Sequence, residues 1–133
     1  ISCSLVGSEM CIRDRAYEMI RGMMRHSMMD SLFTTHPPMQ VDGTMGIVAG
    51  FAEMLLQSRT GRLHLLPALP EAWKNGSVRG LKARGNITVD MDWKDGRVTQ
   101  FRLSSPVAQS VKVAANGTEK TYELTPETPV KGS

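Results

Sequence analysis

Cysteine and aromatic residues are scarce in this chain of 133 residues. Its two cysteines, Cys3 and Cys11, both lie within residues 1–15, so the rest of the chain offers no disulfide framework and no thiolate metal site. The three histidines are dispersed and make a poor ligand set, and we therefore expect no metal and no cofactor. Aromatic residues amount to 5% of the chain, and ten methionines, which pack adaptably, take part of their place in the core.

Long apolar runs and a strong charge of one sign are also missing. No stretch reaches the roughly 18 apolar residues that a membrane helix needs. The formal net charge of +3 is mild, and basic residues do not alternate with aromatic ones. We therefore expect neither a membrane nor a nucleic acid as a partner.

Residues 1–15 follow neither a helical nor a strand period. The part from Glu9 to Arg15 resembles a translated sequencing adaptor, a tag found in many metagenomic gene predictions. We interpret residues 1–15 as such an artefact and leave them out of the fold prediction, as an expression tag is left out. The alternative is a genuine but irregular N-terminus. No signal peptide is recognisable, which carries no meaning for a chain that begins at an artificial join.

Two helices are predicted next. The first runs from Ala16 to about Met29, because four apolar residues share one helical face: Tyr17, Ile20, Met24 and Met28. The second is capped by Thr44 and runs to about Ser58, where Thr60-Gly61 reads as its stop. Two helices with apolar stripes cannot bury both without a further partner, which indicates that helices upstream are missing.

The second half of the chain predicts antiparallel strands. From Ile87 to Trp93 apolar and polar residues alternate, and the sequence from Lys94 to Arg97 is typical of a tight hairpin turn. Residues 98–104 form the return strand, and residues 111–124 form a second hairpin around Asn116-Gly117. The tail from Thr125 is rich in Pro and Thr, and we expect it to fray. The fold class is therefore α+β, with two helices followed by a small antiparallel β unit.

The densest polar cluster lies between the helices, in residues 34–43. His36, Gln40 and Asp42 can each form hydrogen bonds, and two prolines stiffen the segment that leads into the second helix. A rigid loop of this kind can present polar groups to a pocket. The alternative is a helix-capping Asp42 and a surface His36, which spacing alone favours.

Other polar residues have ordinary explanations beside functional ones. Glu53 is either a general acid or a solvated helix position. Asp90 and Asp92 share one face of a strand, where they could bind a cation or simply face water. Three Asn-x-Ser/Thr sequences match the glycosylation pattern, and two of them, at Asn75 and Asn116, are Asn-Gly dipeptides that turn chemistry already explains.

Residues 32–93 resemble glycoside hydrolase family 95. The resemblance is carried by ordered blocks, which are Leu32–Gly43, Ala49–Ser58, His64–Pro70, Ala72-Trp73, Gly76–Val78, Gly80–Gly85 and Trp93–Gly96. The family has an (α/α)6 barrel with the active site, followed by a C-terminal β domain. The resemblance therefore implies that residues 16–60 are the last barrel helices and residues 61–133 the β domain, in a fragment whose missing partner is the upstream barrel of the same chain.

The resemblance also implies an activity. The family hydrolyses terminal α-1,2-linked L-fucose on oligosaccharides with inversion, using an acid on the leaving oxygen and a base on the attacking water. In the family the acid is a Glu, and the base is an Asn pair polarised by an Asp, which Asp42 matches. His36 matches a histidine that lines the fucose pocket. The Glu and the Asn pair have no counterpart here, so we expect the chain alone to be inactive. We expect the parent to be a bacterial periplasmic or secreted protein.

Departures from the family pattern leave two alternatives open. Met45 replaces a usual Phe after the Asp42-Gly43 pair, and Met39 replaces another. This change could shift specificity from α-L-fucosides to α-L-galactosides, which differ by one hydroxyl. The second alternative is a non-catalytic module, either sugar-binding or structural, although Trp93 and Tyr122 alone offer few aromatic platforms for a sugar.

Overall fold

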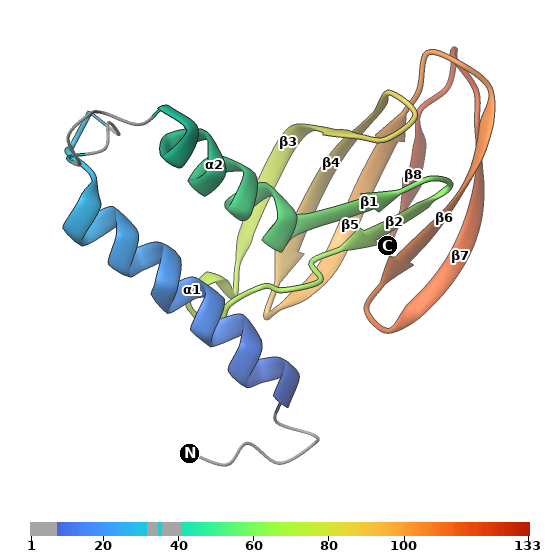
Figure 1. The fold of residues 1–133 in the computed structure, drawn as a ribbon. Coiled ribbons are helices and arrows are strands. Elements are labelled where there is room, and N and C mark those ends of the chain that lie inside the picture. Colours follow the sequence, from blue (N-terminus) through green and yellow to red (C-terminus); the bar gives the residue numbers. More distant parts are fainter. Residues whose placement is uncertain (1–7, 32–34, 36–40) are drawn as a thin grey trace. The chain divides into compact units, whose positions relative to one another are not determined.

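The computed structural model describes residues 8–31, 35 and 41–133, with the backbone alone for residues 8–12 (Figure 1). The chain divides into two compact units, Ile1–Phe51 and Ala52–Ser133. Two helices followed by strands confirm the predicted α+β fold class.

The first helix, α1 (Ser8–Ser27), is longer than predicted. It begins eight residues before Ala16, inside the segment that we interpret as an artefact. Tyr17, Ile20 and Met28 on the predicted apolar face are half-buried, whereas Met24 on the same face is 38% exposed. No helix in the described part of the chain is long and apolar enough to cross a membrane.

The second helix, α2 (Val41–Leu55), is shifted toward the N-terminus relative to its prediction. Thr44 was wrong as the cap, because the helix already begins at Val41. The predicted end at Ser58 was also wrong. The helix ends at Leu55, whose carbonyl accepts a hydrogen bond from the backbone N–H of Leu66 at 2.8 Å, and the next residues leave the helix as a strand.

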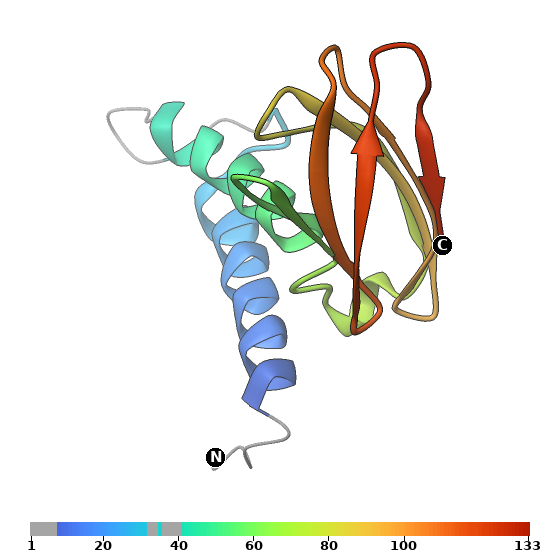
Figure 2. The same cartoon turned by 90° about the vertical axis from the view of Figure 1, so that its right-hand side faces the viewer.

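Two four-stranded sheets make up most of the second unit (Figures 1 and 2). The first sheet has the order β1-β2-β6-β7 and the second the order β3-β4-β5-β8. Strands β2 and β6 pair in parallel, and every other neighbouring pair is antiparallel. The bounds are β1 (Leu56–Arg59), β2 (Arg62–Leu65), β3 (Gly76–Ala83), β4 (Ile87–Lys94), β5 (Arg97–Ser104), β6 (Gln109–Ala115), β7 (Thr118–Leu124) and β8 (Val130–Gly132), with a short 3-10 helix η1 (Glu71–Trp73) before β3.

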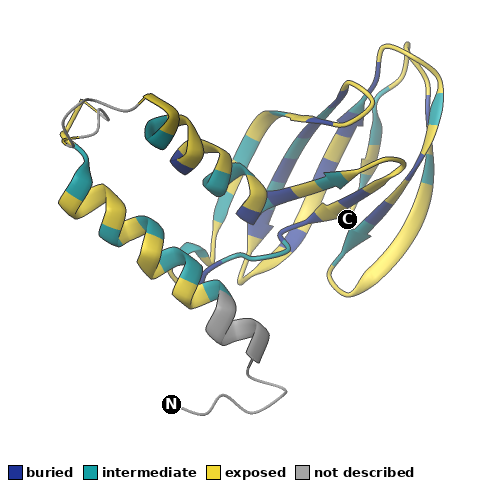
Figure 3. Cartoon of the chain, viewed as in Figure 1, coloured by how far each residue is buried: buried dark blue, intermediate teal, exposed yellow. Residues whose placement is uncertain are grey.

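Apolar side chains from both sheets form one core (Figure 3). Leu63 of β2, Val89 of β4 and Leu103 of β5 are fully buried. Burial of an aliphatic side chain of this size contributes about 1.5–3 kcal/mol. The alternation predicted from Ile87 to Trp93 is confirmed, because every second residue of β4 is buried. The second unit is therefore a β-sandwich that closes its own core.

Both predicted hairpin turns are confirmed. In the β4–β5 turn Asp95 and Gly96 have φ values of 51° and 74°, and in the β6–β7 turn Asn116 and Gly117 have 52° and 78°. Positive φ at both central residues suits the right-handed twist of a hairpin, and Asn, Asp and Gly adopt it at low cost. The Thr60-Gly61 pair, predicted as a helix stop, is instead the turn between β1 and β2.

The prediction that the tail from Thr125 frays was wrong, because β8 pairs with the edge of β5. Gly132 makes this close approach possible. A Cβ at that position would collide with the ring of Phe101 and lie 2.9 Å from the hydroxyl of Tyr122. Strand β3 was not predicted either, since its register breaks at a β-bulge between Val78 and Leu81 that removes the period of two.

Candidate functional site

Asp42 lies in the first turn of α2 and is exposed. The N-terminal end of a helix carries a partial positive charge, which favours an ionised carboxylate there. Within the part of the chain that the structure describes, the Asp42 side chain forms no hydrogen bond and no ion pair. Its two oxygens are therefore open to accept hydrogen bonds from groups outside the described residues.

His36 and Gln40, the other polar members of the predicted cluster, lie outside the described residues. The nearest described position is Thr35, whose backbone N–H donates to the carbonyl of Ser27 at 2.9 Å, at the C-terminal end of α1. The role of His36 as a substrate ligand stays a prediction.

An exposed apolar stripe runs along α2 beside Asp42. Val41, Met45 and Val48 follow one another at helical spacing and are 52%, 67% and 58% exposed. Met45 stands one turn after Asp42, so the two share a side of the helix. Glu53, the alternative acid candidate, is exposed near the other end of α2. An exposed apolar stripe of this kind is typical of a helix face that another element covers.

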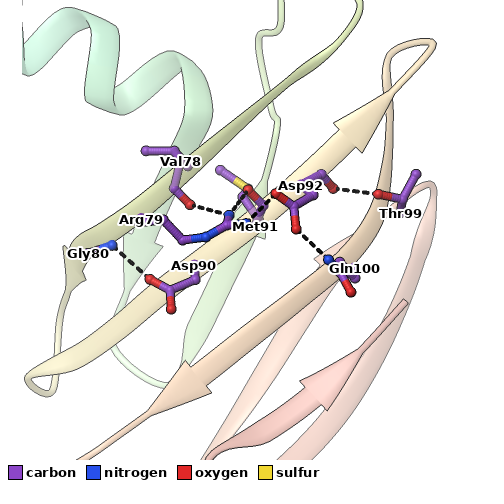
Figure 4. Close-up of polar contacts among 8 residues, drawn as sticks. All are labelled: Val78, Arg79, Gly80, Asp90, Met91, Asp92, Thr99 and Gln100. Atoms are coloured by element: carbon purple, nitrogen blue, oxygen red, sulfur yellow. Dashed lines mark hydrogen bonds and ion pairs between the residues drawn. The ribbon is translucent and has the colours of Figure 1, made fainter.

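The second candidate cluster, Asp90 and Asp92, lies on the outer face of the second sheet (Figure 4). Asp92 Oδ1 accepts a hydrogen bond from Arg79 Nη2 at 2.5 Å, and its Oδ2 accepts one from Gln100 Nε2 at 2.5 Å. Asp90 Oδ1 accepts the backbone N–H of Gly80 at 2.8 Å. The hydrogen bond and charge of Arg79, with the hydrogen bond from Gln100, lower the pKa of Asp92 below its usual 3.8.

Arg79 was not singled out in the sequence, although it organises this cluster. Besides Asp92, its guanidinium donates to the carbonyls of Val78 at 3.0 Å and of Met91 at 2.9 Å. The β-bulge in β3 turns this side chain onto the sheet face. The signal that could have found it is the Arg79-Gly80 pair, since glycine in a strand often marks a bulge.

The donors around Asp90 and Asp92 argue against a cation site. Both oxygens of Asp92 already accept hydrogen bonds from Arg79 and Gln100, and a guanidinium occupies the place that a metal would take. Among the described residues no three His, Cys, Asp or Glu side chains are grouped as a metal site requires.

The aromatic residues that could have formed a sugar platform are used in the sandwich. Trp93 is 8% exposed, and its Nε1–H donates to the carbonyl of Trp73 at 2.8 Å. Tyr122 is half-buried, with its ring edge-on to Phe101 at a centroid distance of 5.5 Å. The Trp93 ring therefore presents no open face on which a sugar could stack, and part of the Tyr122 ring surface is used in packing against Phe101.

Two of the asparagines in glycosylation patterns hold turns in place, as turn chemistry predicts. Asn75 Oδ1 accepts the backbone N–H of Asp95 at 2.9 Å. The Asn116 amide makes two bonds to the backbone of Val98, at 2.8 Å each, and so joins the β6–β7 turn to the start of β5. Both asparagine side chains therefore stabilise turns of the sandwich.

Comparison with known proteins gives two adjoining family matches. The glycosyl hydrolase family 95 catalytic domain matches residues 8–55, and the glycoside hydrolase family 95 C-terminal domain matches residues 57–131. Alpha-L-fucosidase 2 of Arabidopsis thaliana is 45% identical over 97 residues, which is 72% of this chain and 12% of that protein. Probable alpha-fucosidase A of Aspergillus niger is 33% identical over 78 residues, 50% of this chain and 10% of that protein. The chain thus spans about an eighth of the length of these relatives.

Proposed function

The chain belongs to glycoside hydrolase family 95, and on that premise we propose that it is the C-terminal part of an inverting α-L-fucosidase that removes terminal α-1,2-linked L-fucose from oligosaccharides. The observation that carries the proposal is the matched pair of domains, with α2 and Asp42 in the catalytic match and the β-sandwich in the C-terminal match. The names of the relatives, which describe α-fucosidases, support the sugar. The partner of this chain is the upstream part of the same barrel.

Asp42 is the residue of this chain that we assign to catalysis. In the proposed mechanism its carboxylate polarises an amide pair from the upstream barrel, which then accepts a proton from the attacking water. An amide is a weak base, and a neighbouring negative charge raises its ability to accept that proton. An exposed carboxylate at the start of a helix, with no bond to the described residues, is available for this role. His36 is assigned to a hydroxyl of the bound sugar.

The exposed stripe of Val41, Met45 and Val48 supports the dependence on upstream helices. Covering these side chains removes apolar surface from water at about 25 cal/mol per Å². The same covering would surround Asp42 with protein and strengthen its interaction with the amides. The chain alone therefore holds one catalytic contributor, Asp42, without the acid or the base.

The test of the catalytic assignment uses the full-length enzyme that contains this chain. We expect Asp42→Asn to lower kcat on an α-1,2-fucosylated oligosaccharide by about 10²–10⁴-fold, the range typical of general-base groups. Glu53→Gln makes the same carboxylate-to-amide change at an exposed position of the same helix, and we expect it to leave kcat within about twofold of the parent. Near-normal turnover of Asp42→Asn would remove Asp42 from the mechanism. Release of fucose by the 133-residue chain alone would contradict the missing acid and base.

An α-L-galactosidase activity is the second candidate, and Met45 is the observation that favours it. Its side chain stands where the family usually has Phe and is 67% exposed beside Asp42. A flexible thioether in place of a flat ring could leave room for the additional hydroxyl of L-galactose. Rates on the nitrophenyl glycosides of the two sugars, measured side by side for the full-length enzyme and its Met45→Phe variant, decide between them.

A further inference from the structure

A hollow of about 230 Å³ lies on the outer face of the second sheet of the β-sandwich. We call it the polar hollow. Its side chains come from all four strands of that sheet, and the ones that carry the inference are Arg79, Asp90, Asp92, Gln100, Arg102 and Lys131. A volume of this size suits a single sugar residue or a molecule of similar bulk.

One side of the polar hollow is rigid. Arg79 donates to the carbonyls of Val78 and Met91 and to Asp92, so its guanidinium is fixed on the sheet face (Figure 4). Asp92 in turn holds Gln100 by its Nε2. A site whose polar groups are already held in place loses little side-chain entropy when a ligand binds.

The other side carries cations without partners. Arg102 of β5 is opposite Asp90 of β4 on one side and opposite Lys131 of β8 on the other. Within the described part of the chain, neither the Arg102 nor the Lys131 side chain forms a hydrogen bond or an ion pair, and both residues are exposed. Like charges directly opposite on neighbouring strands repel one another. An anion placed between Arg102 and Lys131 would relieve this repulsion.

Acceptors remain open beside these cations. Asp90 uses one oxygen for the N–H of Gly80, and its other oxygen has no partner among the described residues. Gln100 donates its Nε2–H to Asp92, and its Oε1 has no partner among the described residues. Carboxylate and amide oxygens accept hydrogen bonds from hydroxyl groups. The hollow therefore combines an anion-binding end with hydroxyl-binding groups next to it.

We propose that the polar hollow binds an acidic saccharide unit, with the acid group between Arg102 and Lys131 and neighbouring hydroxyls on Asp90 and Gln100. The hexuronate residue is the simplest ligand of this class, because it joins one carboxylate to several hydroxyls on a ring. The site uses none of the residues assigned to catalysis and does not depend on the fucosidase assignment. It would give the β domain a glycan contact without any exposed aromatic ring.

The test compares two probes that differ in one group. Methyl β-D-glucuronide and methyl β-D-glucoside have the same ring and hydroxyls, and only the former has a carboxylate. Both are titrated into the ¹⁵N-labelled 133-residue chain at low salt, and backbone amide shifts are followed. We expect the glucuronide to shift amides of Arg102, Lys131 and Gln100, and the glucoside to bind at least about fivefold more weakly. The glucuronide affinity should fall as salt rises.

Variants locate the charge contribution. Arg102→Gln and Lys131→Gln should each weaken glucuronide binding by roughly 1.5-fold to fivefold and leave glucoside binding unchanged. Lys120→Gln removes an equal charge from the exposed part of β7 in the other sheet and should change neither affinity. Because Arg102 and Lys131 make no internal bonds to the described residues, these substitutions leave the sandwich folded.

Several outcomes would overturn the proposal. One is equal affinity for the two probes, or no shift with either. Another is a shift confined to the smaller hollow of the first sheet, which is lined by Gln57, Arg59, Arg62 and His64. Sodium acetate serves as a third probe in the same titration. If acetate binds as tightly as the glucuronide, the hollow binds anions only and the proposed sugar contacts at Asp90 and Gln100 are refuted.

Discussion

Asn116 is a small side chain whose truncation should lower the free energy of unfolding of the β-sandwich. It stands in the β6–β7 turn with φ of 52°, and its amide both accepts from and donates to the backbone of Val98. Asn116 belongs to the first sheet and Val98 to the second, so these two hydrogen bonds connect the two sheets at one end. Truncation to Ala removes both bonds and leaves Ala in a left-handed conformation.

The magnitude follows from these two losses. A hydrogen bond of this kind contributes about 0.5–1.5 kcal/mol to stability, so two contribute about 1–3 kcal/mol. A left-handed backbone costs Ala about 1–2 kcal/mol. We therefore expect Asn116→Ala to lower the free energy of unfolding by about 2–5 kcal/mol. Asn116→Gly keeps the conformational freedom and should lose only the hydrogen-bond part, about 1–3 kcal/mol.

Asn86 provides the matched control. It has φ of 56° in the turn before β4, and its side chain forms no hydrogen bond with any other described residue. Asn86→Ala should therefore report the backbone term alone, about 1–2 kcal/mol. Urea unfolding followed by tryptophan fluorescence suits the comparison, because Trp73 and Trp93 both lie in the second unit. If Asn116→Ala costs no more than Asn86→Ala at unchanged m-value, the bridge to Val98 contributes nothing and the reasoning fails.

Two further predictions concern the second sheet. Gly76 is directly opposite Trp93, and a Cβ there would collide with the indole ring, so Gly76→Ala should destabilise the sandwich by about 1–3 kcal/mol. In a Trp93→Leu background, Gly76→Ala should hardly change the free energy of unfolding. An equal loss of stability in both backgrounds of this double-mutant cycle would argue against a collision between the added Cβ and the indole ring. The lowered pKa of Asp92 means that the Arg79 pair stabilises the fold above the usual carboxyl pKa of 3.8 and that this contribution is lost as pH falls below it. The free energy of unfolding, measured with urea between pH 5 and 2, should therefore decline less in Asp92→Asn than in the parent chain. Parallel declines in the two proteins would refute the stabilising role of the pair.

Local turn chemistry explains why the hairpins could be predicted from the sequence. Asp95-Gly96 and Asn116-Gly117 specify their turns with two residues each, and the alternation in β4 specifies which face is buried. These signals are short-range, so no partner strand had to be known. The fold class followed from them together with the two helical stripes.

The errors arose where a partner decides the structure. Residues 56–59 form a strand because they pair with β2, although a helix could have continued through them. Strand β8 has three residues and exists because β5 offers an edge, which a Pro- and Thr-rich tail does not reveal. In the polar hollow, Asp90 and Asp92 could be seen to share a face, but the bulge that brings Arg79 onto it depends on the pairing of β3 with β4.

The assignment of Asp42 rests on resemblance rather than on pattern, and the contrast between the two units gives the physical reason. The β-sandwich buries its own apolar residues, and every buried side-chain N or O atom of the described residues has a hydrogen-bond partner, so the contacts of its core are accounted for within the chain. At the start of α2, Val41, Met45 and Val48 are exposed, and the neighbouring Asp42 carboxylate has no partner among the described residues. Two charges 4 Å apart in water interact by about 1 kcal/mol, whereas the same pair near a protein surface interacts by about 4 kcal/mol. An element that covered the stripe would therefore bury apolar surface and strengthen the field of Asp42 in one step, which is why the role proposed for Asp42 depends on a covering element and could not be predicted from this helix alone.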